Sequence, residues 1–331
     1  MTRTTISLDE PGATAHPGGP EPHGTTETMI FGFDIGGTTI RGAEVLPGLD
    51  LGPVRRAPTP ARDFDAFVST LRDMIAAASA RPEAIAISLP GVMNPATREA
   101  LCANIPCLNG RRVEEDLASA LGLPVVVAND ADCFTVAEAR AGAGRGHRIV
   151  FGAILGTGIG GGLVVDGRLI NATGGFAGEW GHAPIAARMA GNPPVEMPRL
   201  RCGCGLEGCL ETLGSARGIE RLDAHFHART LAAEDIIAAA EAGDPLSRRT
   251  VGWFVEIVSA PLAMVVNVTG ATIVPVGGGL SNAPSLLQAI DEAVRAFTLC
   301  RFSEPVVVRG QCRHEPGIIG AALLAGVDGT A

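Results

Sequence analysis

The pattern of apolar and polar positions divides the chain into short apolar strands and longer amphipathic helices. Residues 30–34 read as an apolar strand ending in Asp34, and a glycine turn leads to a second strand over 39–46. Residues 64–80 place apolar side chains at helical spacing after Asp63, a favourable N-cap. Further strands are predicted near Val54 and over 84–89, 124–128, 272–276 and 305–308, and further helices over 113–121, 131–141, 211–226, 232–242, 245–269, 281–297 and 317–325.

The first strand–turn–strand pattern occurs a second time, 120 residues further along the chain. Segment 31–45 aligns with segment 151–165, and each combines an apolar strand, a glycine-rich hairpin turn and a second strand. The repeat predicts an α/β fold made of two β-β-β-α-β-α halves with a cleft between them. Identical residues in this alignment are Phe31/Phe151, Gly32/Gly152, Gly36/Gly156, Gly42/Gly162 and Val45/Val165.

The length of 331 residues allows two domains. Residues 1–28 are rich in Gly and Pro and contain no apolar segment, so we expect a disordered tail without a secretory signal. Residues 29–141 are expected to form one domain together with a C-terminal helix within 315–331. Residues 142–314 are expected to form a larger second domain that contains a cysteine motif.

The amino-acid composition indicates which kinds of binding partner the protein can have. Hydrophobic residues make up 46% of the chain, which is ample for a buried core. The net charge of −9 argues against a nucleic-acid or anionic-membrane surface, because both depend on clustered basic residues. The apolar stretch 251–268 contains Glu256 and Pro261, which is more typical of a buried helix than of a membrane span. We therefore expect a cytoplasmic protein that binds small molecules.

Three glycine runs, at 36–37, 156–162 and 277–279, suggest a binding site for phosphate groups. Glycine tolerates positive φ and close approach, so backbone N–H groups in such turns can hold phosphate. The second run is followed by a strand over 163–165, which excludes a dinucleotide-binding fingerprint, and no run is a Walker A loop. Simple tight hairpins are the alternative. Candidate nucleotide-binding residues are Asp34, Gly36, Gly37, Thr38, Thr39, Gly156, Thr157, Gly158, Gly160, Gly161, Gly278 and Gly279.

Asp34 occurs in the first hairpin only, since Ile154 is its counterpart in the second. A carboxylate beside a phosphate turn is repulsive unless it holds Mg²⁺, directly or through water. The alternative is that Asp34 caps the turn with its side chain.

Three cysteines fall within eight residues, at Cys202, Cys204 and Cys209. The glycines between them allow the backbone to wrap so that three thiolates converge on one zinc ion. The best candidate for the fourth ligand is His182, whereas His225 and His227 face different sides of a helix and read as surface residues. A site with four protein ligands would be structural. The alternative is a loop with three free thiols.

Asp130 follows a buried strand and precedes a helix. The carboxyl ends of strands border the ligand crevice in open α/β sheets, so Asp130 is placed to accept a proton from an attacking hydroxyl. The alternative is that Asn129, Asp130 or Asp132 only caps the helix.

With these segments, the chain resembles the ROK family (repressors, open reading frames, kinases), and within it the bacterial N-acetylglucosamine kinases. The resemblance covers roughly residues 29–327, and the cysteine element with its upstream histidine is its most specific part. The segments that carry it are Phe33–Thr38, Ala103–Pro106, Asn129–Phe134, Leu155–Gly162, Gly178–His182, Cys202–Glu211 and Gly277–Asn282.

The resemblance implies an actin-like, hexokinase-like ATPase fold, ATP and Mg²⁺ as donor and cofactor, and a homodimer. It implies structural zinc on His182, Cys202, Cys204 and Cys209, and Asp130 as the base that deprotonates the 6-hydroxyl of N-acetylglucosamine. One departure is Thr39, where many members carry Lys. The positions that match sugar-binding residues of the family are Asn104, Asn129, Asp130, Glu179, His182 and Glu211.

Three alternative functions compete with this one. A kinase for glucose, N-acetylmannosamine or fructose would share the same motifs. A sugar-responsive repressor needs a helix-turn-helix before the first hairpin, and residues 1–28 lack the apolar periodicity for one. A zinc-stabilised nucleic-acid-binding module is disfavoured by the acidic net charge.

Overall fold

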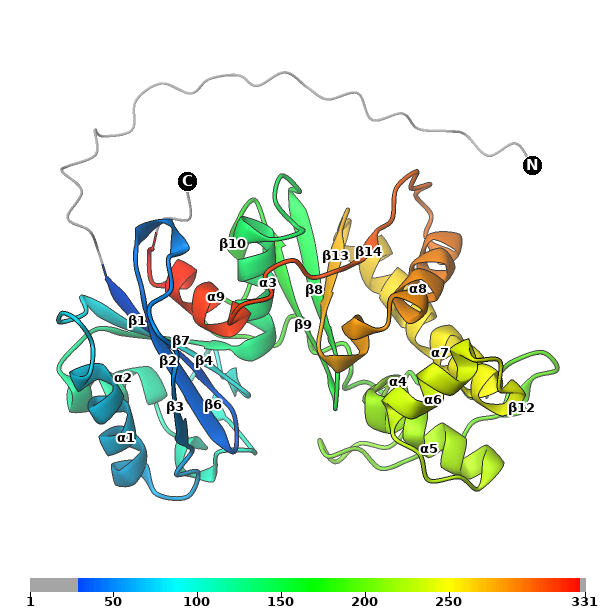
Figure 1. Ribbon diagram of the computed structural model, residues 1–331, viewed down its shortest axis with the longest axis horizontal. Helices are drawn as coiled ribbons and strands as arrows, with labels where there is room; N and C mark the ends of the chain where they lie inside the picture. Colours follow the sequence, from blue (N-terminus) through cyan, green and yellow to red (C-terminus); the bar gives the residue numbers. More distant parts are fainter. Residues whose placement is uncertain (1–28, 328–331) are drawn as a thin grey trace, which may run out of the picture.

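The computed structural model describes residues 29–327, which form two five-stranded sheets flanked by helices (Figure 1). The tail predicted over 1–28 and the last residues of the segment 315–331 lie outside the described residues. The two sheets have the same topology: two antiparallel pairs at one edge and two parallel pairs at the other. The predicted duplication is therefore confirmed. The division into domains at residues 141 and 314 stays a prediction.

The first sheet has the strand order β3-β2-β1-β4-β7. Its outer helices cover one face because their apolar positions recur every three to four residues. In α1, Phe67, Leu71 and Met74 are buried, and the Asp63 side chain accepts the Ala66 N–H at 3.0 Å as the predicted N-cap. The elements are β1 (Ile30–Ile35), β2 (Thr39–Val45), β3 (Arg55–Pro58), α1 (Phe64–Ala76), β4 (Ala84–Leu89), β5 (Val92–Met93), β6 (Ala100–Leu101), α2 (Val113–Leu121), β7 (Val125–Asn129) and α3 (Asp130–Ala141).

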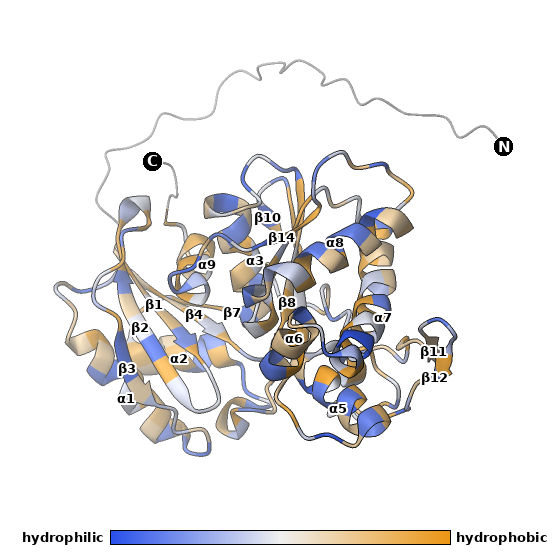
Figure 2. Ribbon diagram, turned by 45° about the vertical axis from the view of Figure 1, so that its right-hand side comes forward, coloured by the Kyte–Doolittle hydropathy of each residue, from blue (hydrophilic) through white to orange (hydrophobic). Residues whose placement is uncertain are grey.

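The second sheet has the strand order β10-β9-β8-β13-β14 and carries a longer helical insertion after β10. Helix α5 of this insertion carries both hydrophilic and hydrophobic residues (Figure 2), and Ile219 and Leu222 are buried in the same core as Trp253 of α7. The elements are β8 (Ile149–Leu155), β9 (Ile159–Val165), β10 (Arg168–Leu169), β11 (Met189–Ala190), β12 (Val195–Glu196), α4 (Glu211–Gly214), α5 (Ala216–His227), α6 (Ala233–Glu241), α7 (Pro245–Thr269), β13 (Val274–Gly277), α8 (Pro284–Phe297), β14 (Val307–Arg309) and α9 (Pro316–Leu324).

The strand register corrects the alignment of the two hairpins. In the first hairpin Ile35 pairs with Ile40, whereas in the second Leu155 pairs with Ile159, so the second turn is one residue shorter. Beyond the turn, the structural counterpart of a first-hairpin residue therefore lies one position earlier than the offset of 120 predicts. The matches Gly42/Gly162 and Val45/Val165 are wrong for this reason, while those before the turn are confirmed.

Helices α3 and α9 lie between the two sheets (Figure 1). In α9, Ile318 belongs to a core cluster with Ile30 of the first sheet, and Ile319 belongs to one with Val150 of the second. The two helices touch closely, since a Cβ on Gly320 would lie 1.8 Å from the Cys133 carbonyl oxygen. Only glycine fits at position 320, because any side chain would clash with the Cys133 carbonyl. This close contact lets α3 and α9 pack directly against each other.

Three predicted helices differ from the structure by more than one residue at an end. The helix predicted over 211–226 breaks at Ser215, whose backbone is extended (φ −108°, ψ 175°) and whose hydroxyl accepts the Gly218 N–H at 3.2 Å. Serine here caps a new helix, which overrides the continuous apolar spacing. The helix predicted over 281–297 begins at Pro284 after a 3₁₀ turn, and the one predicted over 64–80 ends at Ala76.

Helix α7 is long and apolar enough to cross a membrane by length and composition alone, with a mean hydropathy of 1.7 in its most apolar window. In the fold Trp253, Phe254, Ile257 and Val258 are buried in the core of the second sheet. A core helix of a globular fold passes the same composition test, so α7 agrees with the predicted buried helix.

Candidate active site and metal centre

A cleft of about 720 Å³ opens where the two sheets and α9 meet. Its walls come from the end of β1 and the first hairpin turn, from the start of α3, and from the segments after β13 and β14. Eight predicted site residues line it: Asp34, Gly36, Gly37, Thr38, Thr39, Asn104, Asp130 and Gly278. Residues from the two halves of the chain thus meet around one solvent-filled space.

Asp34 lies at the end of β1 and is held on both carboxylate oxygens. Ser88 at the end of β4 donates its hydroxyl to Oδ1 at 3.1 Å, and Arg41 of β2 forms an ion pair with Oδ2. The predicted alternative, in which the Asp34 side chain caps the hairpin turn, finds no such hydrogen bond among the described residues. The turn closes instead through the Gly36 N–H, which donates to the Thr39 carbonyl at 2.9 Å.

The second hairpin turn, Gly156–Gly158, faces the cysteine element. The Ile159 N–H donates to Glu211 Oε2 at 3.0 Å, and a Cβ on Gly158 would lie 2.5 Å from the same oxygen. Of this hairpin only Ile154 is among the residues that line the cleft. Gly160 and Gly161 lie within strand β9 and not in the turn, and the Phe151 ring leaves no room for a side chain at Gly161.

The third glycine run, residues 277–279, packs against the second hairpin turn. Gly277 and Gly278 line the cleft, and Gly279 begins the 3₁₀ turn that follows β13. Gly278 has a left-handed backbone (φ 83°), and a Cβ there would lie 2.4 Å from the Leu155 carbonyl oxygen. Glycine is therefore required where β13 passes the end of β8. The role of these glycines in nucleotide binding stays a prediction.

Asp130 is the first residue of α3, and most of the capping role falls to its neighbour. The Asn129 side chain accepts the N–H groups of Ala131 at 2.8 Å and Asp132 at 3.4 Å, and donates to the Gly91 carbonyl at 2.9 Å. Asp130 shares in this cap, since its Oδ1 also accepts the Ala131 N–H at 2.9 Å, and its carboxylate lines the cleft.

The environment of Asp130 makes it a stronger base than an ordinary aspartate. Its side chain is open to the cleft, while protein atoms surround its other sides. This desolvation, together with the nearby carboxylates of Asp34 and Glu179, raises the pKa of Asp130 to about 6, although the hydrogen bond from the Ala131 N–H lowers it. A base with a pKa near neutrality is well matched to proton abstraction from a hydroxyl.

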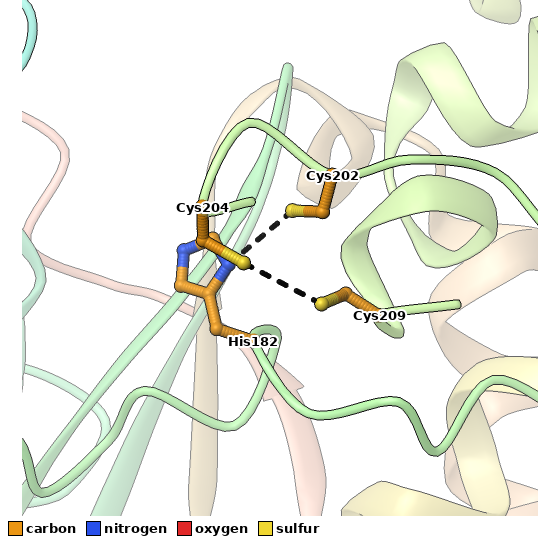
Figure 3. A group of neighbouring side chains, drawn as sticks. All are labelled: His182, Cys202, Cys204 and Cys209. Atoms are coloured by element: carbon orange, nitrogen blue, oxygen red, sulfur yellow. Dashed lines mark hydrogen bonds between the residues drawn. The ribbon is translucent and has the colours of Figure 1, made fainter. Parts of the chain in front are cut away.

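His182, Cys202, Cys204 and Cys209 point toward one another (Figure 3). Their ligand atoms all lie within 4.8 Å of one another; His182 Nδ1 is 3.6 Å from Cys202 Sγ, and Cys204 Sγ is 3.6 Å from Cys209 Sγ. Bond lengths in a tetrahedral zinc site put sulfur atoms about 3.8 Å apart, and sulfur and nitrogen about 3.6 Å apart. Three thiols and one imidazole at these spacings fit zinc.

The rival histidines lie elsewhere. His225 is exposed on α5, and His227 is partly exposed on the same helix. The His227 ring stacks on Trp253 with ring centroids 5.8 Å apart, so packing accounts for its position. Neither belongs to the cysteine cluster.

Glu211 connects the cysteine cluster to the second hairpin. One carboxylate oxygen accepts the Ile159 N–H, and the other lies 3.8 Å from Cys202 Sγ. On the far side of the imidazole, His182 Nε2 lies 3.8 Å from Glu179 Oε2, and burial raises the pKa of Glu179. The His182 ring therefore points Nδ1 toward the cysteines and Nε2 toward Glu179.

Three polar side chains of this region were not singled out as candidates from the sequence. Ser88 and Arg41 hold Asp34, and Asn171 donates to both carboxylate oxygens of buried Asp132, at 3.3 and 3.1 Å. Asn171 also pairs with the backbone of Ala177, just before Glu179. Strand alternation could have indicated Arg41, two residues after Thr39, but no local pattern identifies Asn171.

The chain belongs to the ROK family, whose sequence model matches residues 30–327. It is 38% identical over 299 residues to the N-acetylgalactosamine kinase AgaK of Shewanella sp. (strain ANA-3), covering 89% of this chain and 96% of the relative. It is 33% identical over 299 residues to an N-acetyl-D-glucosamine kinase of Yersinia pseudotuberculosis serotype O:3 (strain YPIII), covering 89% and 98%. The predicted family and a sugar kinase activity are thereby confirmed.

Solved structures support the same fold. A ROK hexokinase from Thermus thermophilus has a TM-score of 0.76 at 31% identity, covering 89% of this chain and 97% of that chain. A ROK family glucokinase from Streptomyces griseus, in complex with glucose and AMPPNP, has a TM-score of 0.70 at 27% identity, covering 89% and 98%. The predicted hexokinase-like fold is confirmed, and this chain has the fold of sugar kinases that use ATP.

Proposed function

We propose that this chain transfers the γ-phosphoryl group of ATP to the 6-hydroxyl of N-acetyl-D-glucosamine, with Asp130 as the general base. The observation that carries this proposal is the position of Asp130 at the carboxyl end of β7, open to the same cleft as Asp34 and the first hairpin turn. Phosphoryl transfer needs a base within reach of the acceptor hydroxyl and a donor held by backbone amides and a cation.

The donor would lie along the first hairpin turn and the third glycine run. Gly36, Gly37 and Gly278 line the cleft and let backbone N–H groups approach phosphate oxygens closely. Asp34 would hold Mg²⁺, which neutralises charge on the donor's phosphate groups when it is bound. A Cβ on Gly37 would lie 3.2 Å from the Asn104 carbonyl oxygen, so this narrow part of the cleft has no space for a larger residue.

The sugar would be held by polar groups near Asp130 and His182. We propose hydroxyl contacts for Asn104, Asn129, Glu179, His182 and Glu211. Zinc on the cysteine cluster would be structural, since all four ligands come from the protein and no open position remains. Its role would be to fix the His182 ring, so that Nε2 keeps one orientation toward the sugar.

N-acetyl-D-galactosamine is the second candidate substrate. It is favoured by the 38% identity to the Shewanella kinase, against 32–33% for the N-acetyl-D-glucosamine kinases. Glucose, N-acetylmannosamine and fructose are weaker candidates; the glucokinase from Streptomyces griseus is 27% identical to this chain and a putative N-acetylmannosamine kinase from Listeria monocytogenes is 26% identical. We further propose that the enzyme acts in the cytoplasm as a homodimer, with ATP and sugar as its partners.

A kinetic comparison of sugars tests the substrate. Initial rates of ADP formation would be measured with N-acetylglucosamine, N-acetylgalactosamine, N-acetylmannosamine, glucose and fructose at saturating Mg-ATP. We expect kcat/KM for N-acetylglucosamine to exceed that for each other sugar by at least about tenfold, since one well-placed hydrogen bond discriminates by this much. A higher value for N-acetylgalactosamine would replace the proposed substrate with the second candidate.

Replacing Asp130 with Asn tests the mechanism. The amide keeps the shape of the side chain but accepts no proton, so kcat should fall by about 10²–10⁴-fold while both ligands still bind. Single-turnover rates and calorimetric titration of the sugar would measure the two effects separately. A variant that keeps wild-type kcat would exclude Asp130 as the base.

A further inference from the structure

We propose that Arg41 is the side chain that binds the phosphate groups of the nucleotide, and that it exchanges Asp34 for phosphate when the magnesium-bound donor enters the cleft. This inference rests on the proposed function, because it assumes that the cleft accepts a nucleoside triphosphate. It adds a donor-binding residue and a change of ion-pair partner to that function.

The composition limits which side chains can carry a permanent positive charge. The sequence contains no lysine, so all 26 residues counted as Lys or Arg are arginines. Any charge-assisted hydrogen bond from a permanently cationic side chain to a phosphate oxygen must therefore come from a guanidinium group. Arginine suits this task, since its planar fork offers five N–H donors that match phosphate geometry.

Among the described residues, four arginines line the cleft: Arg41, Arg56, Arg309 and Arg313. Arg309 donates to the Asn282 side chain, and the Arg56 side chain is 67% exposed. Arg41 is 38% exposed and pairs directly with Asp34, the predicted magnesium carboxylate. It is therefore the arginine in direct contact with the proposed cation site at the phosphate turn.

Two carboxylates hold the Arg41 guanidinium in the cleft. One is Asp34, and the other is Glu315, whose Oε2 lies 3.0 Å from Arg41 Nη1. Glu315 precedes α9 and has a left-handed backbone (φ 48°, ψ 54°), which costs a non-glycine residue about 1–2 kcal/mol. Such an outlier at a cleft points to a functional constraint. The Glu315 carboxylate, with 12% of its side chain exposed, contacts Arg41 Nη1, whereas Asp34 contacts Nη2.

The second hairpin shows that this ion pair is not needed to form the hairpin itself. Asp34 pairs with Arg41 in the β1–β2 register, and the counterpart pair of the β8–β9 register is Ile154 and Gly160. The second hairpin forms the same antiparallel pairing without either charge. The charges of the first hairpin are therefore available for a ligand.

Exchange of partners follows from the charges. The guanidinium occupies Asp34 Oδ2, and a divalent cation bound to the same carboxylate would repel it, so the two positive groups compete for Asp34. When Mg²⁺ and triphosphate enter together, Asp34 gains the cation, and the Arg41 group released from Asp34 faces the phosphate oxygens. Glu315 stays paired with Arg41 and keeps it beside the hairpin turn. The guanidinium thus supplies the positive charge that Thr39, as a neutral residue, cannot.

Arg41→Ala tests the inference. We expect KM for Mg-ATP to rise by at least about tenfold while KM for the sugar changes less than twofold, because a charge-assisted bond to phosphate is lost. Arg41→Lys should recover part of the loss. Thr39→Lys combined with Arg41→Ala should also recover part of it, since it restores a cation on the same face of β2.

Arg55→Ala is the matched control. Arg55 is also an arginine near this sheet and is paired with a carboxylate, Glu44, but it does not line the cleft. Its loss should leave KM for Mg-ATP unchanged. Thermal unfolding of each variant measures structural damage separately. If Arg41→Ala lowers only the melting temperature and leaves KM for Mg-ATP within twofold of wild type, the inference is overturned.

Calorimetric titration with magnesium and a non-hydrolysable ATP analogue separates this inference from the proposed function. If wild type binds the analogue and Arg41→Ala binds it at least about tenfold more weakly, the inference holds even when no tested sugar is phosphorylated. Equal binding by both proteins overturns it while leaving the kinase activity intact. A wild-type protein that binds no analogue overturns both.

Discussion

The two β-hairpins of this protein share topology but differ in chemistry. The first, β1–β2, ends in Asp34 and pairs it with Arg41, and its turn lines the cleft. The second, β8–β9, has Ile154 and Gly160 in those positions, and its turn contacts Glu211 beside the cysteine cluster. The two halves thus share the same hairpin backbone, but the polar side chains on the two hairpins differ.

This difference assigns the two hairpins separate tasks in the proposed reaction. The first carries charged groups suited to magnesium and phosphate. The second carries glycines that let it pack against Gly278 and Glu211, so it connects the third glycine run to the proposed zinc site. The following experiments ask whether the hairpins can be damaged independently.

Among the changes that compare the two hairpins, Asp34→Asn should have the largest effect. It removes the carboxylate proposed to hold Mg²⁺, so kcat/KM for Mg-ATP should fall by at least about 100-fold. The matched change in the second hairpin is Ile154→Val, which should cost about 0.5–1.5 kcal/mol of stability and leave kcat/KM almost unchanged. Steady-state kinetics and thermal unfolding measure both. Equal losses of kcat/KM in the two variants would refute the functional asymmetry of the hairpins.

Cys204→Ser should separate the sugar side from the donor side. Loss of one ligand should release zinc and raise KM for the sugar by about 10–100-fold through a disordered His182, with a smaller effect on KM for Mg-ATP. Elemental analysis gives the zinc content, and steady-state kinetics give both KM values. The exposed Cys300 provides the control, since Cys300→Ser should keep both zinc and activity. Purified wild-type protein without zinc would exclude the four-ligand site.

The pH profile should report Asp130, which lies between the two hairpins. The base works only when deprotonated, and its pKa is raised to about 6. Therefore kcat/KM for the sugar should fall about tenfold from pH 7 to pH 5. Asp132→Asn is the control. It removes the other nearby carboxyl group whose pKa is raised, and it should leave this acidic limb of the profile unchanged. An acidic limb that shifts to pH 4 would contradict the raised pKa.

Asp132→Asn itself should have the smallest effect, on stability. Burial raises the pKa of Asp132 to about 7, with 4% of the residue exposed, so the folded state binds its proton more tightly than the unfolded chain. The free energy of unfolding should then fall as pH rises from about 4 through 7. Asn cannot ionise, so this fall should be smaller in the variant. Melting temperatures from pH 5 to pH 8 test it, and identical profiles would rule out the Asp132 contribution.

Most of the fold could be predicted from local patterns. Apolar runs ending in glycine turns predicted β1, β2, β8 and β9, and helical spacing after Asp63 predicted α1. The break at Ser215 was missed because apolar spacing continues across it, and only the serine side chain's capping bond interrupts the helix. The one-residue difference between the hairpin turns was missed because glycines match glycines at either offset.

The sequence by itself determined which residues are able to do chemistry: a thiol cluster with its histidine, a carboxylate after a buried strand, and glycine turns. These follow from spacing along the chain, which the backbone converts directly into local geometry. Only the tertiary structure decided that Arg41 contacts Glu315 and that Asn171 contacts Asp132. Such pairs join distant segments, and their contacts depend on how the sheets and α9 pack together, which no local pattern records.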